Sequence, residues 1–102
     1  MEETDKLVID LESITEQTYD ILGANIKYIL SRMFAGAAIN ATVKGPPNKV
    51  HAFYDTIKKE RNFLVQAKRL GLDNPNTYKN KAKLDTSVKN FERETGLKWP
   101  LK

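Results

Sequence analysis

The chain of 102 residues contains no cysteine and a single histidine, His51. Without cysteine it forms no disulfide framework, zinc–thiolate site or cysteine nucleophile, and one imidazole does not make a usual zinc site. It also has no glycine-rich phosphate loop, GxGxxG sequence or Walker sequence. No nucleophile stands near His51 in the sequence, so the sequence predicts no catalytic residue, no metal site and no cofactor.

Long apolar runs are absent too, because none approaches the ~20 residues that a membrane-spanning helix needs. The first residues are acidic, whereas a secretory signal begins with a basic segment followed by an apolar one. The content of 40% hydrophobic residues argues against disorder, and the length favours one domain. We therefore expect a soluble, cytoplasmic protein without contact to a membrane.

Charge is divided unevenly behind the formal net value of +4. Residues 1–43 hold three Lys or Arg and seven Asp or Glu, a net charge of −4. Residues 44–102 hold fourteen basic and six acidic residues, a net charge of +8. A basic half is typical of a protein that binds a polyanion. Two alternatives are an attraction between the two ends of the chain and ordinary solvated helix faces.

Helical periodicity of the apolar residues predicts an all-α fold with three helices, over about residues 13–43, 47–70 and 77–95. The sequence Ser13-Ile14-Thr15-Glu16 fits a capping box at the start of the first helix. Gly45-Pro46-Pro47-Asn48 is a short turn before the second helix. It favours a long antiparallel hairpin of the first two helices, with the third as a C-terminal addition.

Residues 1–12 precede the first helix and contain four apolar residues close together: Leu7, Val8, Ile9 and Leu11. A single strand is not stable by itself, and no partner strand is evident in the sequence. We therefore expect residues 1–12 to form an acidic N-terminal arm or a helical turn.

The first helix carries a second apolar seam beside its main apolar face. Its members follow a seven-residue spacing with one further residue at the end: Ile14, Ile21, Tyr28, Ala35 and Ile39. A helix with two apolar seams contacts two neighbours. One neighbour is expected to be the second helix, and the other is either the third helix or another subunit. The seam is thus the predicted oligomer interface.

Mostly basic stripes follow the polar sides of the second and third helices. Ammonium and guanidinium groups on a rigid helix can neutralise successive phosphates, and amides can hydrogen-bond to phosphate or base edges. Solvated helix faces are also commonly rich in lysine, which is the alternative explanation. The predicted DNA-binding residues are Lys58, Asn62, Gln66, Arg69, Lys79, Lys83, Lys89 and Arg93.

The single tryptophan, Trp99, lies in a short apolar tail after the third helix. A tryptophan near a terminus docks either into a groove of its own domain or onto a partner. Trp99 is accordingly a candidate for partner docking, with docking in its own domain as the alternative.

The stretch GPPNKVHAFYDTIKKERNFL, Gly45 to Leu64, follows a long helix and resembles the helix–proline turn–helix core of tailed-phage small terminase subunits. The sequence LDTSVKNFERETG, Leu84 to Gly96, resembles the C-terminal helix of the short, podovirus-type DNA-packaging proteins. The acidic start MEETDKLVIDLESI is also similar to theirs. The likeness is one of layout across most of the chain. Many larger members use a helix-turn-helix motif for DNA, which is not found here, so the basic stripes would replace it.

The resemblance implies a non-enzymatic protein that assembles through the seam into a ring-shaped homo-oligomer. It would recognise viral DNA in the host cytoplasm and present it to a large terminase subunit, which supplies the ATPase and nuclease activities. The alternative is a small helical interaction protein, such as an inhibitor, adaptor or nucleotide sponge, that binds an acidic protein or ligand.

Overall fold

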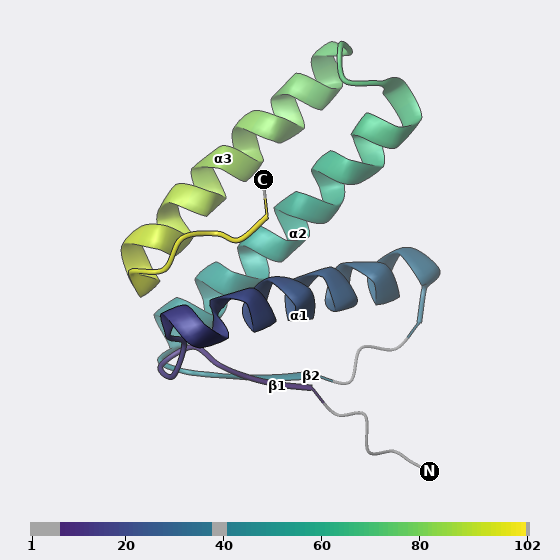
Figure 1. Ribbon diagram of the computed structural model, residues 1–102. Helices are drawn as coiled ribbons and strands as arrows, with labels where there is room; N and C mark the ends of the chain where they lie inside the picture. The colour runs from purple at the N-terminus through teal and green to yellow at the C-terminus, as the bar shows by residue number, and fades with distance from the viewer. Residues whose placement is uncertain (1–6, 38–40, 102) are drawn as a thin grey trace. The chain divides into compact units, whose positions relative to one another are not determined.

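A computed structural model describes residues 7–37 and 41–101. The elements, in chain order, are β1 (Leu7–Asp10), α1 (Glu16–Ala35), β2 (Ala41–Lys44), α2 (Pro47–Leu70) and α3 (Pro75–Thr95) (Figure 1). Over these described residues the protein is mostly helical with three helices, and the predicted all-α class is confirmed. Two compact units make up the chain. The first combines the residues up to Val50 with those from Pro100 onward, and the second spans His51–Trp99.

The first unit contains a two-stranded parallel sheet, in which Leu7 pairs with Ala41 and Asp10 with Lys44. Parallel neighbours need a long crossover connection, and α1 supplies it. One side of the helix is buried, at Leu22, Ile26, Ile29 and Leu30. Ile9 and Leu11 are buried as well, and α1 contacts β1. An isolated pair of strands is only marginally stable, so the helix contributes the apolar cover that this one needs.

The first helix is shorter than the predicted range of 13–43. Gly36 has a left-handed φ of 68°, and the Ala37 N–H donates to the Arg32 carbonyl over 3.0 Å, which ends the helix at Ala35. Thr42 and Val43 are β-branched and lie in β2. Within the expected arm of residues 1–12, residues 7–10 form β1. The expectation that this segment has no partner strand was wrong, because β2, which follows α1 in the sequence, pairs with it.

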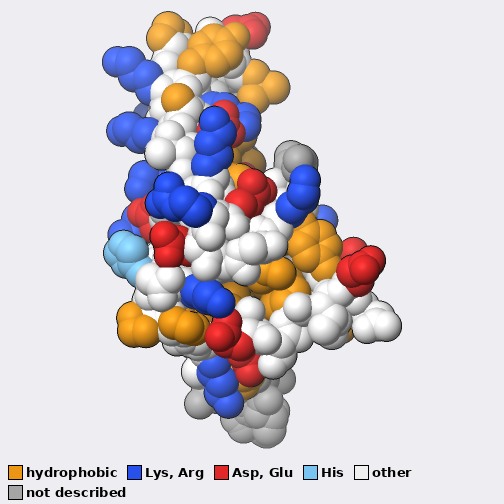
Figure 2. Space-filling model, turned by 90° about the vertical axis from the view of Figure 1, so that its left-hand side faces the viewer, with side chains coloured by type: hydrophobic (Ala, Val, Ile, Leu, Met, Phe, Trp, Pro, Cys, Tyr) orange, Lys and Arg blue, Asp and Glu red, His pale blue; other side chains and the backbone are white. Residues whose placement is uncertain are grey.

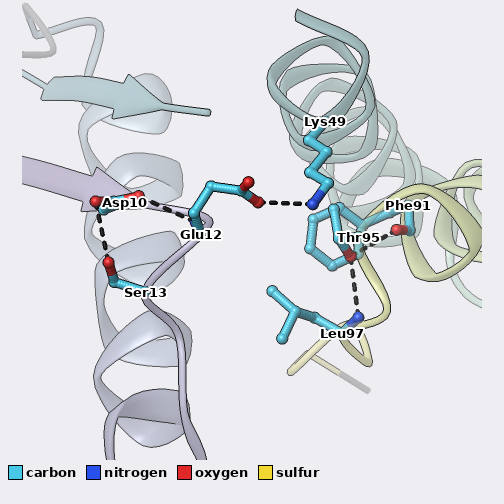
Figure 3. Close-up of polar contacts among 7 residues, drawn as sticks. All are labelled: Asp10, Glu12, Ser13, Lys49, Phe91, Thr95 and Leu97. Atoms are coloured by element: carbon cyan, nitrogen blue, oxygen red, sulfur yellow. Dashed lines mark hydrogen bonds and ion pairs between the residues drawn. The ribbon is translucent and has the colours of Figure 1, made fainter. Parts of the chain in front are cut away.

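The helix also begins later than predicted, at Glu16, and its N-cap is Thr15. The Thr15 N–H donates to Thr18 Oγ1 over 2.8 Å, as in a capping box. The predicted cap residue, Ser13, instead donates its hydroxyl to Asp10 Oδ2 over 3.1 Å (Figure 3). Asp10 therefore organises the turn after β1, and the helix begins after that turn.

An ion pair joins this turn to the first turn of α2, also within the first unit. Lys49 Nζ lies 2.6 Å from Glu12 Oε2 (Figure 3). The Glu12 side chain is half exposed, so the pair is expected to stabilise the fold only slightly. Because β2 lies between α1 and α2, these helices are not joined by the short turn that the sequence analysis expected.

The second unit contains an antiparallel hairpin of α2 and α3. Phe53 lies near Phe91 at one end, and Thr77 Oγ1 lies within 3.4 Å of the Gln66 carbonyl at the other. The helices are joined at Gly71, whose φ is 86°. Helix α3 begins two residues earlier than predicted, because Asn74 caps it by accepting from the Asn76 N–H over 2.9 Å.

Three aromatic side chains form the centre of this unit. Phe53, Phe91 and Trp99 are each at most 1% exposed. The Phe91 and Trp99 rings lie 5.1 Å apart at 80°, an edge-to-face arrangement. Trp99 Nε1 donates to Glu60 Oε1 over 2.9 Å. Trp99 thus fastens the segment after α3 onto both helices of its own unit.

Candidate nucleic-acid interface

Helix α3 presents the more accessible of the two basic stripes. Its predicted DNA-binding residues, Lys79, Lys83, Lys89 and Arg93, are all exposed. From the first to the last, the stripe extends over about 21 Å at 1.5 Å per residue. Figure 2 shows Lys and Arg side chains recurring along the upper part of the surface, where α2 and α3 lie. The stripe therefore offers several cations along one rigid element.

The stripe on α2 is less accessible. Lys58 and Arg69 are exposed, whereas Asn62 and Gln66 are half buried. Asn62 Oδ1 also accepts a long hydrogen bond of 3.4 Å from Arg61 Nη1. The two charged members of this stripe are thus better placed for a ligand than its two amides.

The two stripes share one side of the hairpin. Asp55 of α2 and Thr86 and Arg93 of α3 line the same open hollow, of about 440 Å³. Residues seven apart lie on nearly the same side of a helix. Arg69 is fourteen residues from Asp55, and Lys79 is seven from Thr86, so both lie on the side of the hollow. Folding therefore gathers the exposed cations of both stripes on one surface, which we call the basic face: Lys58, Arg69, Lys79, Lys83, Lys89 and Arg93.

Most acidic side chains of this unit have partners inside it. The unit contains eleven Lys or Arg and six Asp or Glu, a net charge of +5. Five acids form ion pairs or accept hydrogen bonds within the unit: Asp55, Glu60, Asp85, Glu92 and Glu94. By contrast, several cations make no ion pair or hydrogen bond with any described residue: Lys58, Arg69, Lys79, Lys83 and Lys89. Internal pairing thus leaves an excess of accessible positive charge.

The hollow brings in residues that the sequence analysis did not select. Its lining includes Asp55, Ser87 and Asn90, together with Lys89 and Arg93. Ser87 Oγ donates to Asp55 Oδ2 over 2.7 Å, and Lys59 Nζ lies 3.0 Å from Asp55 Oδ1. The spacing of Asp55 and Lys59 could have indicated their ion pair, since i and i+4 are neighbours on a helix. The contact with Ser87 depends on how α2 and α3 align, which no local pattern shows.

The pKa of Asp55 is lowered from its ordinary value of 3.8, first by the Ser87 hydrogen bond and then by Lys59, while burial opposes the shift. The ionised carboxylate consequently stabilises the fold above pH 3.8, and this contribution is lost as the pH falls through the lowered pKa.

In Ser87→Ala, the pKa of Asp55 should rise toward 3.8, which an NMR titration of the carboxyl carbon would measure. Thr86→Ala is the control, because the Thr86 hydroxyl donates to the Ala82 carbonyl. An unchanged pKa of Asp55 in Ser87→Ala would contradict this assignment.

The predicted oligomer seam lies on the first unit and is largely accessible. Ile21 is 57% and Tyr28 39% exposed, Ala35 is exposed and Ile14 is half buried. The fifth predicted member, Ile39, lies outside the described residues. The described part of the seam is therefore a surface rather than a second core.

Trp99 needs a correction as a candidate for partner docking. It is 1% exposed, and its indole N–H and backbone N–H donate to Glu60 and Glu92. A side chain with its ring enclosed and its donor satisfied offers no surface to another molecule. The structure agrees with the alternative, docking in its own domain.

His51 is exposed. Within residues 7–37 and 41–101, no three His, Asp or Glu side chains gather closely enough to hold a metal ion. None of the three described helices is both long and apolar enough to cross a bilayer. Comparisons with protein-family models, curated proteins and solved structures found no match.

Proposed function

We propose that the protein is a non-enzymatic DNA-binding protein and that its basic face contacts the phosphate backbone. One observation carries the proposal: the acids of the second unit are mostly paired internally, whereas exposed cations on the same hairpin are not. Neutralising phosphates releases condensed counterions, and this release supplies most of the affinity of sequence-independent binding.

The spacing of the cations suits a phosphate backbone better than a single small anion. Each DNA strand carries one phosphate per ~3.4 Å of helix axis. The stripe of about 21 Å on α3 is therefore as long as several successive phosphates. A compact ligand such as a nucleotide would contact only part of it. Phosphate contacts position a protein without reading sequence, so the proposed binding has little base preference.

The resemblance to small terminase subunits suggests where such binding would be used. In that role, the protein would hold viral DNA and present it to a large subunit that contributes the catalysis. Assembly with a further copy would multiply weak DNA contacts through effective concentration. DNA binding by the basic face is the first requirement of this role, and it can be tested by itself.

The test is the salt dependence of binding to a duplex of arbitrary sequence. If five cations of the basic face contact phosphates, the slope of log K against log salt should be about −4.5. Affinity should then fall about 500-fold between 50 and 200 mM salt, as fluorescence anisotropy with a labelled duplex would show. Two duplexes of different sequence should give similar slopes. The absence of measurable binding at 50 mM salt would rule out the proposed function.

A further inference from the structure

One side of α1 is exposed along nearly its whole length, and we call it the outer face. Its members repeat every seven residues, in three series: Gln17, Ala24 and Ser31; Asp20, Lys27 and Phe34; and Ile21, Tyr28 and Ala35. This is the spacing of a helix seam that packs against another helix. Phe34 is 49% exposed, which adds a large apolar side chain to the predicted seam. Together with Ile21 and Tyr28, it leaves three large apolar side chains exposed along this side of α1, which is typical of an interaction surface.

The charges on the outer face indicate what fills it. Asp20 and Lys27 are both exposed, and neither forms an ion pair with any described residue. They lie seven residues apart, about 10 Å along the helix, which is too far for them to pair with each other. One acid and one base at this spacing are self-complementary, because the Asp20 of one copy can meet the Lys27 of another.

We propose that the outer face of α1 binds the same face of a second copy of this chain, in an antiparallel, two-fold arrangement. With the axis between Ala24 and Asn25, Ile21 of each copy lies opposite Tyr28 of the other. Asp20 of one copy and Lys27 of the other are then offset by two positions, about 3 Å along the helix, which the lysine side chain can span, so they form two equivalent ion pairs. A two-fold interface uses one surface patch on both subunits, as this pattern requires.

The local shape suits this arrangement. Ala24, a small residue at the centre of the outer face, allows two helix backbones to approach closely. An open hollow of about 250 Å³ lies beside it, lined by Asp20, Ala24 and Lys27 and, from the same unit, by Pro100 and Leu101. The hollow provides room for a large side chain of the facing helix.

A parallel arrangement fits the charges less well. In a parallel pair of helices, a residue at one flank of the seam faces the residue five positions later on the other copy. Lys27 would then face Arg32, and two cations would repel each other. DNA is also a poor occupant, because the outer face carries Asp20 and no excess of positive charge. The antiparallel pair therefore accounts best for the residues of this face.

Sedimentation equilibrium of the full chain without DNA tests the proposal. The wild-type protein should approach the mass of two chains as concentration rises. Asp20→Lys and Lys27→Asp should each weaken association about tenfold or more, because both ion pairs become repulsive. Asp20→Lys combined with Lys27→Asp in one chain should restore it. An equimolar mixture of the two single variants should also pair, since each supplies the charge that the other lacks.

Two further variants separate assembly from folding. Ile21→Glu should abolish pairing with the far-ultraviolet circular dichroism unchanged, because Ile21 is 57% exposed. Asp73→Lys, an exposed charge reversal in the turn between α2 and α3, should leave association unchanged. A monomer at every concentration, an assembly larger than two chains, or failure of the double charge swap to restore pairing would overturn the proposal. None of these results depends on DNA binding.

Discussion

Trp99→Ala should lower the free energy of unfolding by about 3–5 kcal/mol, the usual cost of truncating a large buried aromatic side chain. Trp99 is 1% exposed and contacts the rings of Phe53 and Phe91, so its removal leaves a cavity in the centre of the second unit. It also removes the indole donor from Glu60, which is 7% exposed. A small domain is stable by only about 5–15 kcal/mol, so the variant would be close to unfolding. Urea denaturation followed by circular dichroism would measure the change.

Two milder variants divide this effect between packing and hydrogen bonding. Trp99→Phe keeps an aromatic ring but leaves the Glu60 carboxyl without its indole donor, at a cost of about 1–3 kcal/mol. Adding Glu60→Gln should recover part of that loss, because burial raises the pKa of Glu60 and marks its ionised form as unfavourable there. A loss below about 1 kcal/mol in Trp99→Ala would show that the tail does not stabilise the unit.

The C-terminal ends of α2 and α3 were the best predicted features, because local chemistry determines them. Gly71 and Gly96 have φ of 86° and 75°, and each lies directly after a helix, as expected. Gly36 also lies directly after a helix with a left-handed φ of 68°, but the apolar spacing on both sides of it predicted a continuous helix. A helical pattern can run past a glycine by chance, whereas the left-handed backbone at that position cannot continue a helix.

The β-sheet could not be predicted from local patterns. Each strand has four residues, and Leu7 pairs with Ala41, thirty-four positions later. Neither segment alternates clearly between apolar and polar residues, which is the usual signal of a half-buried strand. Each strand is recognisable only when the other is known. For the same reason, the Asp55–Ser87 contact on the basic face depended on tertiary alignment.

The individual cations of the basic face were predictable, whereas their availability was not. Periodicity placed Lys79, Lys83 and Lys89 on the polar side of the third helix. The sequence does not show which carboxylates are paired with other residues or buried, and so do not neutralise the lysines of the basic face. From its place in the sequence, Glu60 would be expected to balance the charge of its neighbours Lys58 and Lys59, yet its carboxyl is buried against Trp99. Because Glu60 is buried, the surface keeps more uncompensated positive charge for binding a polyanion.

Replacing four of these cations together should have the largest effect on DNA binding. The variant carries Gln at Lys58, Lys79, Lys83 and Lys89, which are exposed and make no ion pair with the described residues. Each phosphate contact contributes about 0.9 log unit to affinity at 0.1 M salt relative to 1 M. The variant should therefore lose about 3.6 log units of affinity at 0.1 M salt, and its salt slope should become shallower by about 3.6. Anisotropy titrations at several salt concentrations give both values.

A matched pair of double variants separates local contacts from net charge. Lys83→Gln with Lys89→Gln removes two charges from the basic face. Lys44→Gln with Lys68→Gln removes two exposed charges elsewhere: Lys44 lies in the first unit, and Lys68 is about 140° round α2 from Asp55. If the basic face contacts phosphates, the first pair should reduce the salt slope by about 1.8 and the second should change it little. Equal effects of the two pairs would mean that DNA responds to overall charge alone, and the basic face would not be the binding site.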